Sequence, residues 1–135
     1  MKKILLIIFA ITLISCDPII SYQFNVENKS DKKLVFKYTH NGVYPKDSVK
    51  VCDAKTNSII DSVTVRGSNP SDEGDNFLSV LDTLKLSTKD SSVITKNIYD
   101  RKNWKYTNKI SHFGIIEVGK NIYTLKIENK DFLNK

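Results

Sequence analysis

Apolar and polar side chains alternate with a period of two along much of the chain, which predicts short β-strands with one buried face. Residues 22–27 and 34–38 each place aromatic or branched side chains at every second position, and the turn-forming sequence Asn28–Asp31 separates them. We therefore predict two consecutive strands joined by a short turn. The same alternation predicts further strands over 49–51, 59–65, 84–86 and 93–98.

The clearest local pattern lies near the C-terminus. Ile115, Ile116 and Val118 precede the sequence Gly119–Asn121, and residues 123–127 then alternate between apolar and polar side chains. Two apolar segments around a short polar segment that contains glycine are typical of a β-hairpin. We predict a hairpin with its turn at Gly119–Asn121.

About seven short strands with polar turns predict an all-β protein, and we expect an antiparallel β-sandwich of immunoglobulin-like type. Beyond the first 15 residues, no stretch sustains the 3.6-residue period of an amphipathic helix, although Phe77–Leu86 could open with a helical turn. The length fits one compact domain, which we place at residues 22–135. The alternation does not determine the order of the strands.

The first residues have a different pattern from the rest of the chain. Lys2 and Lys3 precede an apolar stretch, Ile4–Ile14, which only Thr12 interrupts. A positive segment followed by an apolar one is the layout of an export signal, which is helical. A membrane-spanning helix needs roughly 20 apolar residues to cross about 30 Å of hydrocarbon, so this stretch is too short to span a bilayer. We therefore predict that residues 1–15 are a signal peptide that is removed.

A cysteine follows the apolar stretch and indicates the kind of signal. A large apolar residue, a tolerant position, a small residue and a cysteine occur in that order at Leu13, Ile14, Ser15 and Cys16. This sequence resembles the lipobox of bacterial lipoproteins. The resemblance implies that diacylglycerol is transferred to the Cys16 thiol, that the lipoprotein signal peptidase cleaves before Cys16, and that the new amino group is acylated. Two or three acyl chains would hold the protein at its membrane.

The tether and the charge both point to a membrane surface. We expect residues 16–21 to form a short lipidated tether, and we expect the anchor to lie in the outer membrane with the domain on the periplasmic side. The chain has 21 Lys and Arg, 15 Asp and Glu, and a formal net charge of +6. The basic residues form no clustered stripe, so we expect no nucleic-acid partner; weak attraction to anionic head groups fits the charge better.

Cys52 is the only other cysteine, so no disulfide can form within the chain once Cys16 carries lipid. Two interpretations of Cys52 remain open. In the first, the thiol lies on an outer face and is free to pair with another molecule or to be modified. In the second, it is a small side chain buried in or beside a strand.

The usual catalytic and metal-binding patterns are absent from the sequence. His40 and His112 lie in no paired-ligand spacing, and the five glycines form no phosphate-binding loop. The loop 67–76 matches no calcium-binding pattern, so we expect no metal and no cofactor, although this loop contains Asp72, Glu73 and Asp75. Ser111 beside His112 suggests a hydrolase, but consecutive residues of a strand point to opposite faces. We therefore expect a protein that is not an enzyme.

One segment combines aromatic rings with cationic and amide side chains. It contains the only tryptophan, and the side chains with a binding chemistry are Tyr99, Arg101, Trp104 and Tyr106. Aromatic rings stack on flat apolar faces of sugars or peptides, and neighbouring polar groups fix the orientation. We name this segment as a candidate binding site for an envelope protein or a glycan. The alternative is a connection whose Trp104 closes one end of the sandwich.

An Asp-Ser/Thr-aliphatic sequence occurs three times, at Asp47–Val49, Asp61–Val63 and Asp82–Leu84. Each resembles the acceptor of O-glycosylation in exported proteins of the Bacteroidetes, and the resemblance implies glycosylation of Ser48, Ser62 and Thr83. Turn chemistry at the start of a strand explains the same residues without a modification. The signal, the strand pattern and the closing strand 123–127 with Asp131–Phe132 together resemble small β-sandwich lipoproteins of unknown function from that phylum.

These observations support three hypotheses of function. The first is a non-enzymatic binding or accessory module of the cell envelope, held at the membrane by its lipid. The second is a structural or assembly subunit whose copies join through edge strands. The third is a small hydrolase that uses Ser111, His112 and an unidentified acid. We rank them in this order because the anchor and the strands are clear in the sequence, whereas no catalytic group is.

Overall fold

The computed structural model describes residues 19–40, 46–66, 71–113 and 116–133, and this part of the chain is all-β, as predicted. The strands are β1 (Ile19–Asn28), β2 (Leu34–His40), β3 (Asp47–Cys52), β4 (Asn57–Arg66), β5 (Leu81–Thr88), β6 (Trp104–Phe113) and β7 (Ile116–Ile127). Three short 3-10 turns accompany them, namely η1 (Gly74–Asn76), η2 (Arg101–Asn103) and η3 (Asn129–Asp131). None of the described helical turns is long and apolar enough to cross a membrane. The predicted signal 1–15, its lipobox and Cys16 lie outside the described residues.

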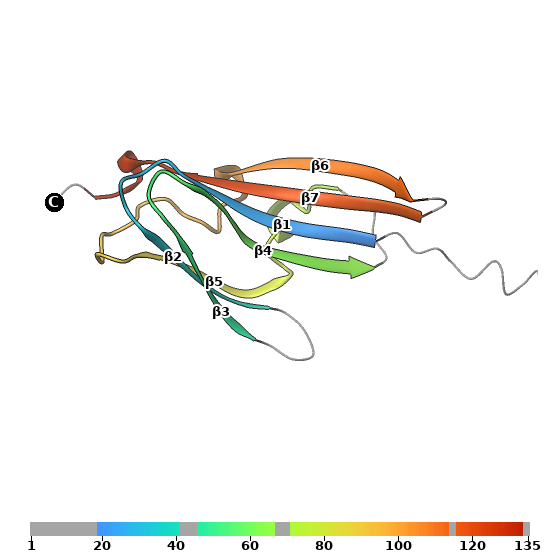
Figure 1. The fold of residues 1–135 in the computed structure, drawn as a ribbon, viewed down its shortest axis with the longest axis horizontal. Helices are drawn as coiled ribbons and strands as arrows, with labels where there is room; N and C mark the ends of the chain where they lie inside the picture. The colour runs from blue at the N-terminus through green and yellow to red at the C-terminus, as the bar shows by residue number, and fades with distance from the viewer. Residues whose placement is uncertain (1–18, 41–45, 67–70, 114–115, 134–135) are drawn as a thin grey trace, which may run out of the picture.

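The strands form two sheets that lie face to face as a sandwich (Figure 1). One sheet has the order β4-β1-β7-β6 and the other the order β3-β2-β5. Neighbouring strands are antiparallel except β1 and β7, which run parallel over the length of β1. The first strand therefore lies inside its sheet and pairs with the last strand. In an immunoglobulin constant domain, by contrast, the first strand lies at the edge of the ABED sheet.

The predicted C-terminal hairpin is wrong in the position of its turn. β7 continues from Ile116 to Ile127 and passes through Gly119–Asn121 without a turn. It pairs with β6 on one side and with β1 on the other, so Gly119 lies opposite Ile110 and beside Ile20. The hairpin partner of β7 is thus β6, and the connection between them begins after Phe113.

Asn121 explains why this stretch has the composition of a turn. The side chain of Asn121 faces the interior and is fully buried. Its amide group donates to the carbonyl of Ser71 at 3.0 Å, and its carbonyl oxygen accepts from the Tyr106 hydroxyl at 2.9 Å. A buried polar side chain is tolerated where hydrogen bonds replace those it makes with water. Asn121 is therefore a hydrogen-bonded core residue and not a turn residue.

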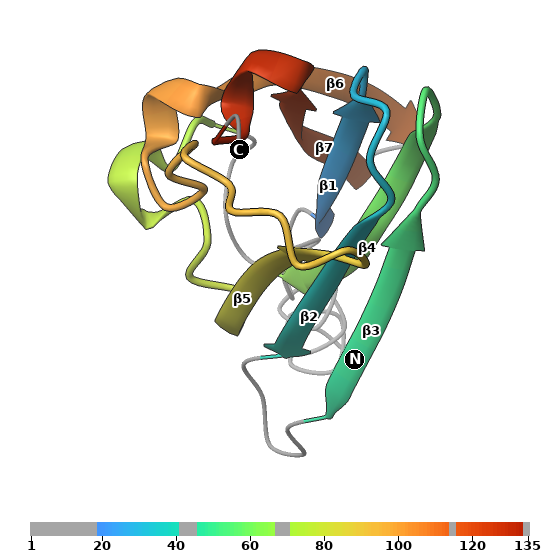
Figure 2. The same ribbon diagram turned by 90° about the vertical axis from the view of Figure 1, so that its left-hand side faces the viewer.

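Residues 93–98 form no strand, contrary to the prediction. Only Ile94 makes an isolated bridge, with Phe132. The segment folds back along β5 (Figure 2), and Ile94, Lys96 and Ile98 are less exposed than the residues between them. The alternation indicates an extended backbone with two different faces, but it does not indicate a partner in a ladder.

β1 begins at Ile19, three residues before the predicted start of the domain. Ile20 is fully buried and continues the inward-facing series Tyr22, Phe24 and Val26. Residues 19–21, which the sequence analysis assigned to the tether 16–21, therefore belong to the sandwich, and residues 16–18 lie outside the described part of the chain.

The inward-facing side chains of both sheets meet in one apolar core. Phe24 stacks on Tyr123 with ring centroids 5.7 Å apart, and Trp104 approaches Phe24 edge-on at 6.1 Å. Full burial of a large apolar side chain contributes about 1.5–3 kcal/mol to stability. The remaining buried apolar residues include Ile20, Val26, Leu34, Phe36, Phe77, Leu84, Leu125 and Ile127.

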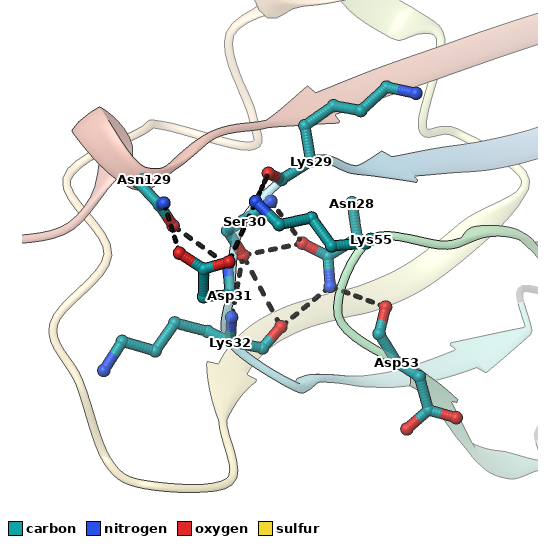
Figure 3. Close-up of polar contacts among 8 residues, drawn as sticks. All are labelled: Asn28, Lys29, Ser30, Asp31, Lys32, Asp53, Lys55 and Asn129. Atoms are coloured by element: carbon teal, nitrogen blue, oxygen red, sulfur yellow. Dashed lines mark hydrogen bonds and ion pairs between the residues drawn. The ribbon is translucent and has the colours of Figure 1, made fainter.

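A polar network fastens the end of the sandwich where β1 turns into β2 (Figure 3). The buried side-chain amide of Asn28 donates to the carbonyls of Lys32 and Asp53 at 2.8 and 2.9 Å. The Asp31 carboxylate accepts from the Asn129 amide at 2.6 Å. The network thus joins the β1–β2 turn, the β3–β4 turn and η3.

Candidate functional site

An open groove of about 510 Å³ lies between the edge strand β5 and the segment 94–99 that folds back beside it. Its walls carry cationic, aliphatic and aromatic side chains, chiefly Lys37, Lys85, Leu86, Ile94, Lys96 and Tyr99. We call it the Tyr99 groove. Sites for small ligands are concave and have volumes of roughly 300–1,000 Å³, so the Tyr99 groove has a suitable size.

Tyr99 is exposed but held in place. Its side chain is 59% exposed, and its hydroxyl donates a hydrogen bond to the carbonyl of Leu84 in β5. Its backbone N–H donates to the side-chain oxygen of Asn97 at 3.0 Å. Because both ends of the residue are fixed, one aromatic ring stays at the wall of the groove and in contact with solvent.

Two lysines face each other across the neighbouring strands. Lys37 in β2 is paired with Lys85 in β5, and directly opposite residues of an antiparallel pair point to the same face. Among the described residues, no carboxylate forms an ion pair with Lys37 or Lys85. In the described part of the chain, the Tyr99 groove therefore carries two adjacent positive charges that no ion pair neutralises.

The opposite wall of the groove is fastened to the C-terminal segment. The Lys96 ammonium pairs with Asp131 at 2.8 Å and donates to the Lys126 carbonyl at 2.7 Å. The N–H and hydroxyl groups of Thr95 both donate to the Asp131 carbonyl, at 2.8 and 3.0 Å. These bonds fix the segment beside β5, and they leave Lys96 without a free charge to offer a ligand.

The other predicted binding residues of this segment point into the protein. Trp104 is 2% exposed, and its indole N–H donates to the carbonyl of Ile98 at 2.8 Å. Tyr106 is half-buried and bonds to Asn121. A ligand on the surface therefore cannot stack on Trp104, which is a core residue at the start of β6. Of the four candidates, Tyr99 alone presents an exposed ring.

Arg101 links Asp72, in the acidic loop that contains Asp72, Glu73 and Asp75, to three neighbouring aromatic rings. Its guanidinium pairs with Asp72, and it lies over the rings of Phe77, Tyr106 and Tyr123, 5.2–5.9 Å from their centroids. The hydrogen bond from Arg101 lowers the pKa of Asp72, and the same bond raises the pKa of Arg101. Burial raises the pKa of Tyr123 to about 12. Because its charge is paired and its face is covered, Arg101 stabilises the fold and is not free to bind a ligand.

The acidic loop makes contacts within the protein. Asp72 pairs with Arg101, and the Glu73 carboxylate accepts a hydrogen bond from the Tyr22 hydroxyl at 2.7 Å. Asp75 lies in η1 and is exposed. In the described part of the chain, no three acidic, histidine or cysteine side chains are placed to hold a metal ion.

A second pair of titratable groups lies between the sheets. Asp61 of β4 has a side chain only 11% exposed, and its Oδ2 is 3.4 Å from Nδ1 of His40 at the end of β2. Among the described residues this oxygen accepts no hydrogen bond, and burial raises the pKa of Asp61. The nearby Tyr38 hydroxyl donates to the Ile60 carbonyl at 2.9 Å. The sequence analysis did not predict this pair. An acidic residue within an apolar strand, as Asp61 is between Ile60 and Val63, is a sign of a buried carboxylate.

Ser111 and His112 do not form the geometry of a nucleophile and its base. They are consecutive residues of β6, so their side chains leave opposite faces of the strand. The Ser111 hydroxyl donates to the carbonyl of Val118 at 3.3 Å. The arrangement therefore gives no support to the hydrolase hypothesis.

The three predicted glycosylation positions lie in strands. Ser62 and Thr83 are exposed, and Ser48 is half-buried. The hydroxyl oxygens of Thr83 and Thr39 are 3.0 Å apart. Ser62 and Thr83 are therefore accessible to a modifying enzyme in the folded protein.

Cys52 is fully buried at the end of β3, and its thiol lies 3.6 Å from the hydroxyl of Thr56. The interpretation as a small buried side chain is confirmed. The interpretation as an outward-facing, reactive thiol is wrong, because residue 52 occupies an inward-facing position of its strand.

We compared the chain with protein-family models, curated proteins and solved structures, and none of them matches it.

Proposed function

We propose that this chain is a lipid-anchored, non-enzymatic binding module of the bacterial cell envelope, and that the Tyr99 groove is its binding surface. The lipobox-like sequence that ends at Cys16 supports the anchor. The size and lining of the groove support the binding role. We place the anchor in the outer membrane, with the domain on the periplasmic side.

The observation that carries this proposal is the fixed and exposed ring of Tyr99. A mobile side chain loses conformational entropy when a ligand immobilises it. The hydroxyl bond to Leu84 has already restricted the Tyr99 side chain in the free protein. The ring is therefore preorganised for stacking on a flat, weakly polar surface.

The start of β1 relates the groove to the anchor. If Cys16 carries lipid, only residues 17 and 18 separate it from Ile19, the first residue of β1. The end of the sandwich at which β1 begins then faces the membrane. Lys37 and Lys85 lie at middle positions of β2 and β5 in the other sheet, so the groove opens beside the membrane and not against it.

Binding to isolated envelopes tests the proposal. Envelopes from cells that lack the protein are titrated with the purified, lipidated protein in detergent. We expect Tyr99→Ala to weaken the saturable binding about tenfold, because a central stacking contact is lost. Ile110→Ala is the matched control, since Ile110 is 51% exposed on β6, away from the groove. Equal binding of wild-type protein and Tyr99→Ala would contradict the proposal.

The edge strand β3 supports the assembly subunit as a second candidate. β3 lies at the edge of its sheet and exposes Val49 and Val51, which are 62% and 47% exposed. Exposed apolar edge strands are sites at which another chain can add a strand. This candidate predicts multimers in sedimentation experiments that Val49→Lys dissociates. A wild-type monomer at high concentration would exclude it.

A further inference from the structure

We infer that the ligand of the Tyr99 groove is a negatively charged saccharide, whose acidic groups contact Lys37 and Lys85 and whose ring stacks on Tyr99. The inference rests on the proposed function, because it names the class of ligand that the groove would bind. It follows from the charges of the groove, the fixed aromatic ring and the apolar side chains of the lining.

The charges favour an anion. Lys37 and Lys85 are directly opposite in the ladder, and like charges in such a pair repel each other. The neighbouring pair on the same face is Thr39 and Thr83, and the Thr39 hydroxyl donates to the Asp47 carboxylate at 2.8 Å. The Asp47 carboxylate is therefore bonded to Thr39 and, within the described ranges, forms no ion pair with either lysine. An acidic group bound between the two ammonium groups would remove their repulsion.

The two charges are local and do not belong to a broad basic surface. Lys96, the third lysine of the groove, is neutralised by Asp131. Two free ammonium groups beside an aromatic ring fit a ligand with one or two acidic groups. A nucleic acid would instead require a continuous basic stripe along a face.

Tyr99 adds a preference for a sugar ring. The ring is 59% exposed while its hydroxyl is bonded to Leu84, so the aromatic face and not the hydroxyl is available to a ligand. Aromatic faces stack on the flat C–H surfaces of sugars. Leu86 and Ile94 give the lining of the groove an apolar character that suits the same surfaces. A simple inorganic anion would use the lysines but gain nothing from the ring.

Calorimetric titration of the full-length, lipidated protein in detergent tests the inference. The probes are tetragalacturonate, its fully methyl-esterified and therefore neutral form, a sulfated heparin tetrasaccharide, and inorganic phosphate. We expect at least one of the two acidic saccharides to bind, and the neutral ester to bind about tenfold more weakly than tetragalacturonate if the latter binds. We expect the affinity to fall as salt is added, because screening weakens exposed charges.

Variants assign the binding to the groove. Lys37→Gln with Lys85→Gln should weaken acidic saccharide binding about tenfold, whereas Lys37→Arg with Lys85→Arg should retain it. Lys105→Gln with Lys109→Gln is the matched control, because both lysines are exposed on β6 in the other sheet. Tyr99→Ala should weaken the saccharides but not phosphate. Thermal unfolding checks that each variant is folded, which the exposure of these side chains leads us to expect.

The outcomes separate this inference from the proposed function. Equal affinity for the acidic and neutral saccharides, with loss of both in Tyr99→Ala, would overturn the charge preference and support the groove as a binding surface. Phosphate binding as tight as saccharide binding would overturn the preference for a sugar. The absence of binding by both acidic saccharides would overturn the inference, while Tyr99-dependent binding to envelopes would still support the proposed function.

Discussion

Asn28 and Asn121 are fully buried asparagines, and each joins segments that are distant in the sequence. Asn28 donates to the Lys32 and Asp53 carbonyls, and Asn121 donates to the Ser71 carbonyl. A buried amide without partners would cost free energy, because the bonds it made with water are lost. Each asparagine therefore favours the arrangement of turns and strands that supplies its partners.

Replacement of Asn28 by alanine should lower the free energy of unfolding by roughly 1–3 kcal/mol, because three carbonyl groups lose their donor. Urea denaturation followed by circular dichroism measures this change. The control Asn57→Ala removes an exposed amide at the start of β4 and should change stability by less than about 0.5 kcal/mol. A loss in Asn28→Ala no larger than that expected of the control would show that the Asn28 network does not stabilise the fold.

Arg101→Gln should reduce stability at pH 7 by roughly 1–3 kcal/mol, a range that allows for the 38% exposure of the Asp72 side chain. The pKa of Asp72 is lowered in the folded state, so its contribution is present above its usual pKa of 3.8 and is lost as pH falls through the lowered value. The difference between the wild type and the variant should therefore shrink below about pH 4. Other carboxylates also have lowered pKa values, including Glu128 at about 2, so this difference, and not the wild-type curve alone, is the test.

Asp61→Asn should change the stability at pH 7 in the opposite direction from Arg101→Gln. Burial raises the pKa of Asp61, so ionisation of its carboxyl group destabilises the folded state as pH rises above 3.8 and through the raised value. The variant should be as stable as the wild type or more stable at pH 7, by up to about 1 kcal/mol. The neighbouring residues His40, 3.4 Å from Asp61, and Tyr38 are the same in both proteins, so the comparison isolates the charge of residue 61. A large loss of stability at pH 7 would show that the charged carboxylate is favourable.

At the scale of elements, alternation of apolar and polar residues predicted β1 to β5, and the structure confirms them. The prediction of strands from alternation failed where the alternation did not come from pairing in a sheet. Residues 93–98 alternate because Ile94 and Ile98 pack against the core, but the segment leaves a groove beside β5 instead of forming a ladder. The turn at Gly119–Asn121 was predicted from composition, and composition does not distinguish a solvated asparagine from a buried one.

The continuity of β7 can be tested by hydrogen exchange. In a strand paired on both sides, every backbone amide points to a neighbouring strand. We therefore expect the amides of Gly119, Lys120 and Asn121 to exchange as slowly as those of residues 123–126. Rapid exchange at these three residues would instead support the hairpin turn.

At the scale of the whole molecule, the candidate site could be predicted only in part. Tyr99 was visible as an aromatic residue in a polar segment. Lys37 and Lys85 were not, because they meet only in one register of β2 against β5, and a shift of one residue would turn either side chain to the other face. Trp104 was named for its chemistry, but its burial depends on how the two sheets pack.

The proposed lipid anchor predicts a simple result for the full-length chain. Cys16→Ser should abolish labelling by fatty acids and leave an unprocessed precursor, because the thiol that accepts the lipid is absent. Cys52→Ser is the matched control and should keep the label, since Cys52 is buried in the folded domain. Metabolic labelling and gel mobility measure both results. Labelling that persists in Cys16→Ser would refute the anchor.

The central claim is that an envelope-anchored domain binds its ligand in the Tyr99 groove, and photo-crosslinking in cells tests it most directly. A photoreactive residue is placed at Ser87, which lines the groove, or at the exposed Thr107 of β6 as a control. We predict a discrete crosslinked species from position 87 that is lost in Tyr99→Ala and absent from position 107. The same species from both positions, or none from position 87, would contradict the claim.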